Sequence, residues 1–185
     1  MVTRVACPCW LNRMATRMVL EPKPGTYALI LSCSTDFGIQ IGRLGTMRLQ
    51  PGYYVYLGSA LGPGGLRARI AHHQKPSLRP HWHIDYLRAL SGFHCVWFSY
   101  DDRRREHQWA RVMRTVSGAT IPLLGFGASD CDCRSHLYFF KHCPSWTGFQ
   151  RALESLVKRH PPVEEFLLES RAHGPIPVPS FPPFR

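Results

Sequence analysis

The alternation of short apolar runs with glycine turns predicts β-strands in the first part of the chain. The run GTYALILS begins at Gly25, and the segments GIQIGRLG, GTMRLQPG and YYVYLG follow it up to Gly58. Runs of this kind, bounded by turn residues, are typical of strands. Because the connections between them are too short for parallel crossovers, we predict a meander of antiparallel strands.

After the glycine-rich turn at residues 62–65, several segments show the apolar spacing of helices. The segment DDRRREHQWARVMRTVSG carries an apolar stripe that includes Trp109 and Met113. We expect Asp101 or Asp102 to cap the start of this helix. The predicted helices are 66–74, 81–90, 101–118 and 146–160, and further strands are predicted at 93–100 and 136–140.

The length of 185 residues suits one compact domain with terminal extensions. Residues 1–23 show no periodicity, and residues 161–185 contain seven prolines, which is typical of extended or disordered segments. We therefore predict an N-terminal extension at 1–23, a folded domain at 24–160 and a Pro-rich tail at 161–185.

The formal net charge of +11 bears on the partners of the protein. It favours polyanions, with nucleic acid as the first expectation and an anionic membrane surface as the second. No apolar run approaches the roughly 20 residues that span a bilayer, and no basic amphipathic helix has a clean apolar face, so we expect no membrane partner. The odd count of 7 cysteines without a secretory signal favours reduced thiols and a cytoplasmic location, with a transit peptide as a weaker alternative.

Two groups of side chains stand out as candidates for chemistry. Tyr27 in the first strand and Tyr56 in a later one would point at one spot if the strands are neighbours, although half-buried strand aromatics are common. Arg69 and His73 lie four residues apart and share a helix face, where an arginine could hold two phosphate oxygens. The alternative for these two, and for nearby Arg67 and His72, is a solvated basic face.

Glu106 is a third candidate, because it lies on the apolar stripe of its predicted helix. A carboxylate on such a face costs free energy unless it is paired or binds a metal. A role at the helix N-terminus, where negative charge is favoured, is an equally good alternative.

These elements together resemble the GIY-YIG nuclease signature. They read Gly25-Thr26-Tyr27, Tyr56-Leu57-Gly58, Leu66-Arg67-Ala68-Arg69 with His73, and Glu106 with Trp109. More narrowly, the blocks YYVYLGSALGPGGLRARIAHH, HWHIDYL and GFGASDCDCRSHL resemble the DUF123 branch of that superfamily, over roughly residues 24–142. Some proteins of this branch carry a fused base-excision glycosylase.

The resemblance implies an α+β domain, a small antiparallel sheet flanked by helices, that hydrolyses DNA phosphodiesters with one Mg²⁺ or Mn²⁺ ion. RNA is an open alternative, and an association with base-excision repair is implied. Tyr27 and Tyr56 would orient or deprotonate the attacking water, which requires a nearby cation to lower a phenol pKa. Arg69 would stabilise the phosphorane, His73 would assist proton transfer or hold a phosphate oxygen, and Glu106 would ligate the metal.

The chain departs from the GIY-YIG pattern in two places. Thr26 replaces the usual isoleucine, and its side chain is expected to face away from Tyr27. The asparagine that the superfamily tends to place near the site is missing, and Ser129, Asp130 or His136 could substitute for it.

The branch-specific blocks add further candidates. His81 and His83 could join Arg67 and His72 in contacting nucleic acid, and Asp85 could be a second carboxylate near the phosphate. The alternative is that His83 and Asp85 bond to each other or cap a turn.

The cysteines of the last block raise the question of zinc. Cys131, Cys133 and His136 could form a zinc site with His81, His83 or Cys143, but C-x-C spacing is less specific than paired C-x-x-C. We therefore expect thiols without zinc.

We thus predict a metal-dependent DNA endonuclease. The alternatives are a non-catalytic nucleic-acid-binding module of the same fold and a small zinc-stabilised interaction protein. The nuclease hypothesis requires Glu106 to converge with Arg69 and both phenols. Glu106 on the opposite side of the sheet from Arg69 would contradict it.

Overall fold

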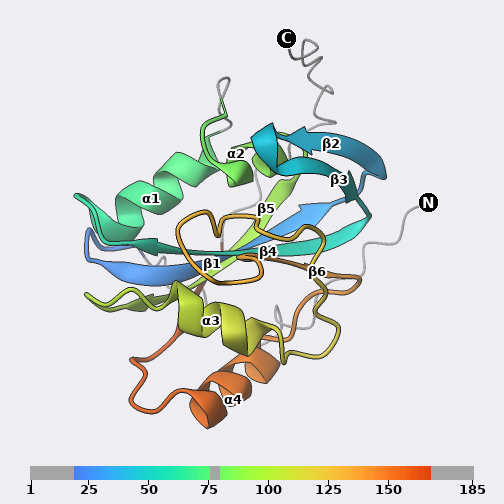
Figure 1. Ribbon diagram of the computed structural model, residues 1–185. Coiled ribbons are helices and arrows are strands. Elements are labelled where there is room, and N and C mark those ends of the chain that lie inside the picture. The colour runs from blue at the N-terminus through green and yellow to red at the C-terminus, as the bar shows by residue number, and fades with distance from the viewer. Residues whose placement is uncertain (1–18, 76–79, 168–185) are drawn as a thin grey trace.

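The computed structural model describes residues 19–75 and 80–167, and its centre is a five-stranded antiparallel sheet (Figure 1). The strands lie in the order β6-β4-β1-β5-β7, so the first strand of the chain is the middle of the sheet. Each neighbouring pair runs antiparallel. The strands are β1 (Gly25–Cys33), β4 (Gly52–Ala60), β5 (Gly92–Tyr100), β6 (Leu137–Phe140) and β7 (Glu164–Leu167).

The two strands after β1 form a separate hairpin, so the predicted meander was wrong. β2 (Phe37–Ile41) pairs with β3 (Gly45–Leu49) as a two-stranded sheet, and β4 returns to pair with β1 along its whole length. β1 is buried on both faces, whereas β2 and β3 alternate exposed and buried residues. Such strands bury one face alone, so they cover the central sheet instead of extending it.

The central sheet is covered by different elements on its two faces (Figure 1). On one face, Tyr27 and Leu29 pack in a core with residues of the β2–β3 hairpin, α1 (Gly65–Gln74) and α2 (His83–Arg88). On the other face, Ala28 and Ile30 pack against α3 (Glu106–Met113) and α4 (Trp146–Leu156). Alternate residues of each strand therefore serve two cores.

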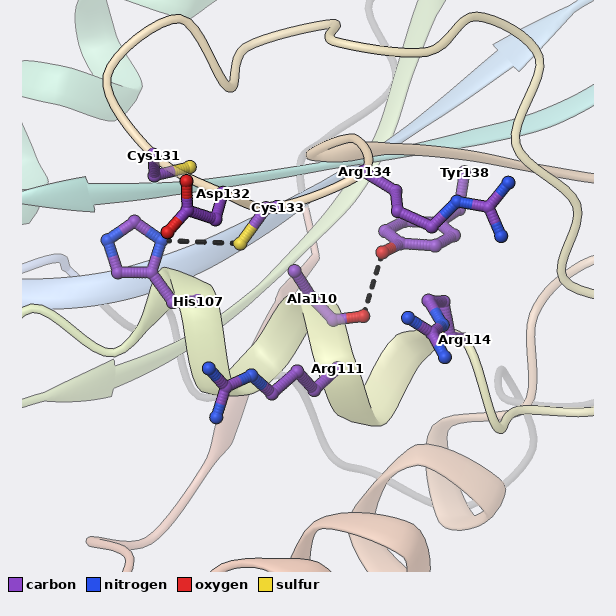
Figure 2. Close-up of a pocket in the computed structure, with 9 residues that line it drawn as sticks. All are labelled: His107, Ala110, Arg111, Arg114, Cys131, Asp132, Cys133, Arg134 and Tyr138. Atoms are coloured by element: carbon purple, nitrogen blue, oxygen red, sulfur yellow. Dashed lines mark hydrogen bonds between the residues drawn. The ribbon is translucent and has the colours of Figure 1, made fainter.

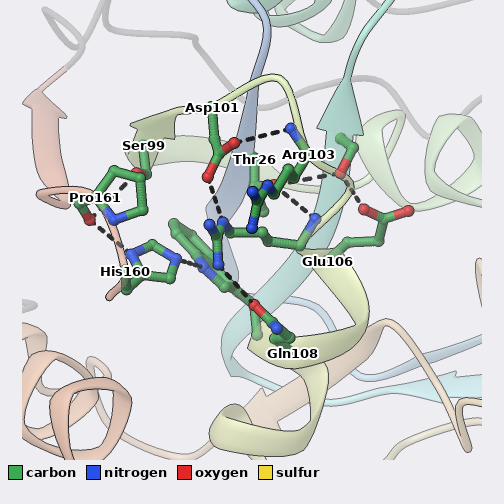
Figure 3. A network of polar contacts seen from close by, with 11 residues as sticks. Thr26, Ser99, Asp101, Arg103, Glu106, Gln108, His160 and Pro161 are labelled. Atoms are coloured by element: carbon green, nitrogen blue, oxygen red, sulfur yellow. Dashed lines mark hydrogen bonds and ion pairs between the residues drawn. The ribbon is translucent and has the colours of Figure 1, made fainter. Parts of the chain in front are cut away.

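The start of α3 lies several residues later than predicted. The helix begins at Glu106, with Arg105 as the residue before it. Asp101 does not cap the helix, because its carboxylate accepts a hydrogen bond from the Arg103 backbone N–H at 2.8 Å and binds the Arg105 side chain (Figure 3). Residues 101–105 thus form a short irregular segment that leads from β5 to Glu106.

Both predicted extensions contribute described residues to the fold. The Lys23 carbonyl accepts from Leu66 N–H at 2.9 Å and the Glu21 carbonyl from Arg67 N–H at 3.3 Å, which anchors the start of α1. Strand β7, within the predicted Pro-rich tail, pairs with β5, and Trp97 Nε1 donates to Glu165 Oε1 at 3.0 Å. Residues 1–18 and 168–185 of these extensions lie outside the described residues.

The predicted fold class is confirmed, because the described residues form one α+β domain with an antiparallel sheet between helices. Within the described residues, no helix combines the length and the apolar character needed to cross a membrane.

Candidate functional site

The candidate site forms where β1 and β4 lie beneath α1. Tyr27 lies opposite Gly58 in the β1–β4 ladder, on the sheet face that α1 covers. Its hydroxyl is 2.8 Å from His73 Nε2, a hydrogen bond between residues 46 positions apart. The predicted meeting of the tyrosine strand with the histidine of the helix is therefore observed.

Tyr56 lies two residues before Gly58 on the same face, and its ring centroid is 6.2 Å from that of His73. Burial raises the pKa of Tyr56 to about 12, and it raises the pKa of Tyr27 well above the usual value. Arg69 pulls both phenol pKa values down, but burial is the larger effect. Both phenols are therefore protonated at neutral pH and are available as hydrogen-bond donors.

His73 is only 2% exposed and stands behind the phenols. Burial, with Arg69, His72 and Arg88 adding positive charge, lowers the pKa of His73 to about 3, so the imidazole is neutral at pH 7. Its Nδ1 atom is the buried side-chain polar atom that finds no hydrogen-bond partner among the described residues. His73 thus positions Tyr27 from inside the domain.

Glu106 reaches this region from the other side of the sheet. Its helix α3 packs on the face opposite α1, and its carboxylate accepts a hydrogen bond from the Ser59 hydroxyl of β4. Glu106 and Arg69 therefore belong to opposite faces of the sheet, which is the arrangement that counts against the nuclease hypothesis unless the two groups meet around the strand edge.

The β4 edge is not paired with β6 at this point, so the two faces of the sheet meet here. β6 pairs with residues 53–56 of β4, and Leu57 N–H donates to the His136 carbonyl at 2.9 Å, so residues 58–60 lie past the end of β6. Burial is the largest cause of the raised pKa values of Tyr27 and Tyr56, and the Glu106 carboxylate is among the charged groups that raise them further. Acid and phenols therefore interact electrostatically around the strand edge.

Two carboxylates at this edge share one cation. Arg104 Nε lies 3.6 Å from Glu106 Oε1, and its Nη1 lies 3.3 Å from Asp130 Oδ2. Glu106 is 5% exposed, whereas the Asp130 and Arg104 side chains are largely exposed. Of the predicted substitutes for the missing asparagine, Asp130 is thus the one linked to Glu106, while Ser129 is exposed.

Thr26 supports the same carboxylate. Its hydroxyl lies 3.3 Å from Ser59 Oγ and accepts a hydrogen bond from Arg105 N–H at 3.3 Å. Polar contacts therefore run from the Arg105 backbone through Thr26 and Ser59 to the Glu106 carboxylate (Figure 3). Its side chain faces away from Tyr27, as predicted, and the departure from isoleucine adds a hydroxyl that orients Ser59.

The open side of the site is rimmed by basic and aromatic side chains. Trp82 is 36% exposed, and the Arg69 guanidinium lies over its ring at 4.6 Å. His72 and His81 contact the same ring, with centroid distances of 4.9 and 6.1 Å. A shallow cavity of about 170 Å³ is lined by Trp82, Arg69 and His72, and the exposed Arg67 follows on α1.

Asp85 caps a turn, which is the alternative to its being a second carboxylate near the phosphate. Its Oδ2 accepts from His81 N–H at 2.9 Å and Trp82 N–H at 3.0 Å, which caps α2. His83 does not bond to Asp85 but accepts from Gly127 N–H at 3.0 Å through Nδ1, which ties α2 to the loop before β6.

The loop before β6 and the start of α3 together form a cluster of metal-binding side chains. The Cys/His cluster consists of His107, Cys131, Cys133 and His136, with one donor atom of each within 4.8 Å of the others. His107 belongs to α3, and the other three belong to the loop. Figure 2 shows His107, Cys131 and Cys133.

Sequence reasoning missed three residues of the site: Ser59, Trp82 and His107. Ser59 and Trp82 lie inside the motif blocks, directly beside residues that were assigned to the motifs or the site from the sequence. His107 directly follows Glu106, but nothing in its spacing connects it with Cys131, 24 positions later.

Residues 26–158 match the family model described as domain of unknown function DUF123. Comparison with curated proteins and with solved structures gave no match. The matched range contains the phenols, α1, α3 and the Cys/His cluster.

Proposed function

The chain belongs to the DUF123 family, and from this premise we propose that it is a GIY-YIG-type endonuclease that hydrolyses DNA phosphodiesters with a divalent ion. The observation that carries the proposal is the hydrogen bond between Tyr27 and His73, at 2.8 Å, with Arg69 and Glu106 acting electrostatically on the same hydroxyl. Paired phenols with a guanidinium and a carboxylate suit a phosphate ester and its cation.

Exposure divides the roles among these residues. Tyr56 and Arg69 keep solvent contact, whereas Tyr27 is 1% and His73 2% exposed. We assign direct contact with the phosphate to Tyr56 and Arg69: the Tyr56 hydroxyl orients the attacking water, and the Arg69 guanidinium stabilises the charge that develops on the phosphate oxygens. Tyr27 and His73 hold the two contacting groups in place.

The carboxylates fit a divalent cation. Arg104 already places a positive charge between Glu106 and Asp130, at 3.6 and 3.3 Å. Mg²⁺ and Mn²⁺ bind oxygen ligands and commonly use one or two carboxylates, so Glu106 and Asp130 would hold the ion once Arg104 moves towards solvent. When bound, the ion would supply Lewis acidity and lower the pKa of its bound water.

The rim of the site suits a nucleic acid. Single-stranded and distorted nucleic acids bind to basic grooves that offer aromatic side chains for stacking. Trp82, with Arg69, His72, His81 and Arg67 around it, forms such a surface on a chain of net charge +11. Such a surface would favour opened or distorted strands, and this supports a role in DNA repair as part of the proposal.

A second candidate function is a non-catalytic nucleic-acid-binding module. The observation that favours it is the burial of Glu106, which is 5% exposed and is engaged by Ser59 and Arg104 on the face opposite α1. A carboxylate held in this way would stabilise the fold without binding a metal.

The test is a cleavage assay on plasmid, nicked and branched DNA with Mg²⁺ or Mn²⁺. We expect Arg69→Ala and Glu106→Gln to reduce cleavage by about 10²–10³-fold, the usual loss when one charge-stabilising group is removed. Tyr56→Phe should reduce it too, whereas Tyr54→Phe should not, because the Tyr54 hydroxyl on the same strand bonds to Gln50. Arg48→Ala and Glu154→Gln are matched controls for the charge changes.

The assay also separates the two candidates. Wild-type protein that binds DNA in a salt-dependent manner but leaves every substrate intact contradicts the nuclease and favours the binding module. Cleavage that all variants retain equally would place the activity elsewhere.

A further inference from the structure

Two donor pairs of the Cys/His cluster lie at the spacing found in a tetrahedral metal site. Cys133 Sγ lies 3.5 Å from His107 Nδ1, and Cys131 Sγ lies 3.5 Å from His136 Nε2. In a tetrahedral zinc site, Zn–S distances of about 2.3 Å and Zn–N distances of about 2.0–2.1 Å place sulfur and nitrogen donors about 3.6 Å apart. These two pairs already stand at that spacing, and all four donor atoms lie within 4.8 Å of one another.

We propose that His107, Cys131, Cys133 and His136 bind one Zn²⁺ ion in a closed site that is separate from the proposed Mg²⁺ position. Two thiolates and two imidazoles in tetrahedral arrangement select zinc over Mg²⁺ or Ca²⁺, which prefer oxygen ligands. Four protein ligands leave no position for a substrate or a reactive water, so the ion is structural.

The ligands come from two separate parts of the chain. His107 lies on the first turn of α3, whereas the other three lie on a loop that closes on itself through Gly125 N–H to the Arg134 carbonyl, at 2.7 Å, and His136 N–H to the Phe126 carbonyl, at 2.8 Å. Zinc at this position joins α3 to the loop. The same loop packs Phe126 against the Tyr56 ring, at 6.1 Å.

The ligand set differs from the one that the sequence suggested. His83 is engaged by Gly127 N–H, and Cys143 lies 3.7 Å from His94. His107 supplies the fourth donor instead. The expectation of thiols without zinc rested on the weak C-x-C spacing, which cannot register a ligand contributed by a distant helix.

The cluster is accessible to an ion from solvent. A cavity of about 300 Å³ opens beside it, and its lining includes His107, Cys131 and Cys133 together with three arginines (Figure 2). Cys131 and Cys133 are free thiols and are partly exposed, so they can exchange a proton for the metal.

The proposed zinc site also lies next to Glu106 of the candidate functional site. His107 Nδ1 faces Cys133, and its Nε2 lies 3.7 Å from Glu106 Oε1. Metal-bound histidines commonly hold a carboxylate with the second ring nitrogen, which fixes both groups. Zinc therefore positions Glu106, and this part of the inference rests on the proposed function.

Metal content tests the zinc site without reference to activity. Full-length chain, purified under reducing conditions and dialysed, is expected to hold one Zn²⁺ per chain. After removal of zinc, Co²⁺ titration should give the visible bands of a tetrahedral site with thiolate-to-cobalt charge transfer. A folded chain without stoichiometric zinc, or an octahedral Co²⁺ spectrum without charge transfer, would overturn the proposal.

Variants identify the ligands. Cys133→Ala is expected to lose stoichiometric zinc, while Cys143→Ser and His83→Gln retain it. Because Cys133→Ala can fail to fold, His107→Cys is the second variant: it keeps four donors, so it should bind Zn²⁺ and strengthen the thiolate-to-cobalt band. Zinc loss in Cys143→Ser, or an unchanged cobalt spectrum in His107→Cys, would contradict the assignment.

The contact with Glu106 has a separate readout. His107→Cys retains zinc but removes the imidazole that faces Glu106, so cleavage should fall while the zinc content stays at one per chain. Unchanged cleavage in this variant would overturn the positioning of Glu106 and leave the zinc site standing. Absence of cleavage in the wild type would instead contradict the proposed function.

Discussion

Gly58 and Tyr27 lie directly opposite each other in the β1–β4 ladder, and a Cβ atom at Gly58 would lie 2.5 Å from the Tyr27 hydroxyl oxygen. The Tyr27 ring therefore occupies the space that any other residue at position 58 would fill. This absence of a side chain lets the hydroxyl reach His73 on α1.

Gly58→Ala is consequently expected to displace Tyr27 and break its hydrogen bond to His73. Overpacking of this kind costs about 1–3 kcal/mol of the free energy of unfolding, which urea denaturation measures. Gly38→Ala is the matched control, because a Cβ at this strand glycine would meet Thr46 at an ordinary 3.8 Å. Equal stability of the two variants would show that Tyr27 adapts without strain.

The elements of the site that depend on local spacing could be predicted from the sequence. Arg69 and His73 share one side of α1 because residues four apart do so in any helix. The burial of Glu106 followed from its place on the apolar stripe with Trp109. These predictions needed no knowledge of how the elements pack.

The elements that depend on long-range packing could not be predicted. The hairpin of β2 and β3 has the same turn signals whether or not it joins the main sheet, and its position is decided by which faces are buried. The face on which α3 packs, and hence the approach of Glu106 around the strand edge, is a property of the assembled core. The meeting of His107 with Cys133 depends on that same packing.

The buried imidazole of His73 makes stability depend on pH. Its pKa is lowered to about 3 in the folded chain, chiefly by burial, whereas an exposed histidine titrates near 6.5. Between these values the unfolded chain binds a proton that the folded chain does not, so stability falls as pH falls. The slope from this residue is about 1.4 kcal/mol per pH unit.

His73→Gln should flatten this dependence between about pH 6 and pH 4. The comparison with wild type removes the contribution of the other histidines, and His72→Gln, on the exposed side of α1, should keep the wild-type slope. Denaturation curves across this range give the measurement. A wild-type slope in His73→Gln would mean that the imidazole is protonated in the folded chain.

Arg104 competes with the proposed divalent ion for Glu106 and Asp130. Removing it in Arg104→Gln should therefore lower the Mn²⁺ dissociation constant. An exposed ion pair is worth about 0.2–1 kcal/mol, which corresponds to a change of up to about fivefold. Mn²⁺ titration followed by electron paramagnetic resonance measures it, with Arg103→Gln as the control. Weaker Mn²⁺ binding in Arg104→Gln would show that the guanidinium supports the site instead of occupying it.

Trp82 is expected to stack on a base of the bound strand. Its ring is 36% exposed and already carries the Arg69 guanidinium on one side, which leaves its accessible surface next to the cavity of about 170 Å³. Trp82→Ala should weaken binding of single-stranded DNA by about 1–3 kcal/mol, the usual contribution of one base stacked on an aromatic side chain.

Phe37→Ala is the matched control, because Phe37 is an exposed aromatic residue, at 51%, on the β2–β3 hairpin. Fluorescence anisotropy at several salt concentrations measures both variants. Since stacking involves no counterion release, the salt dependence of Trp82→Ala should match that of wild type. Equal loss of affinity in the two variants would mean that DNA does not bind at the Trp82 rim.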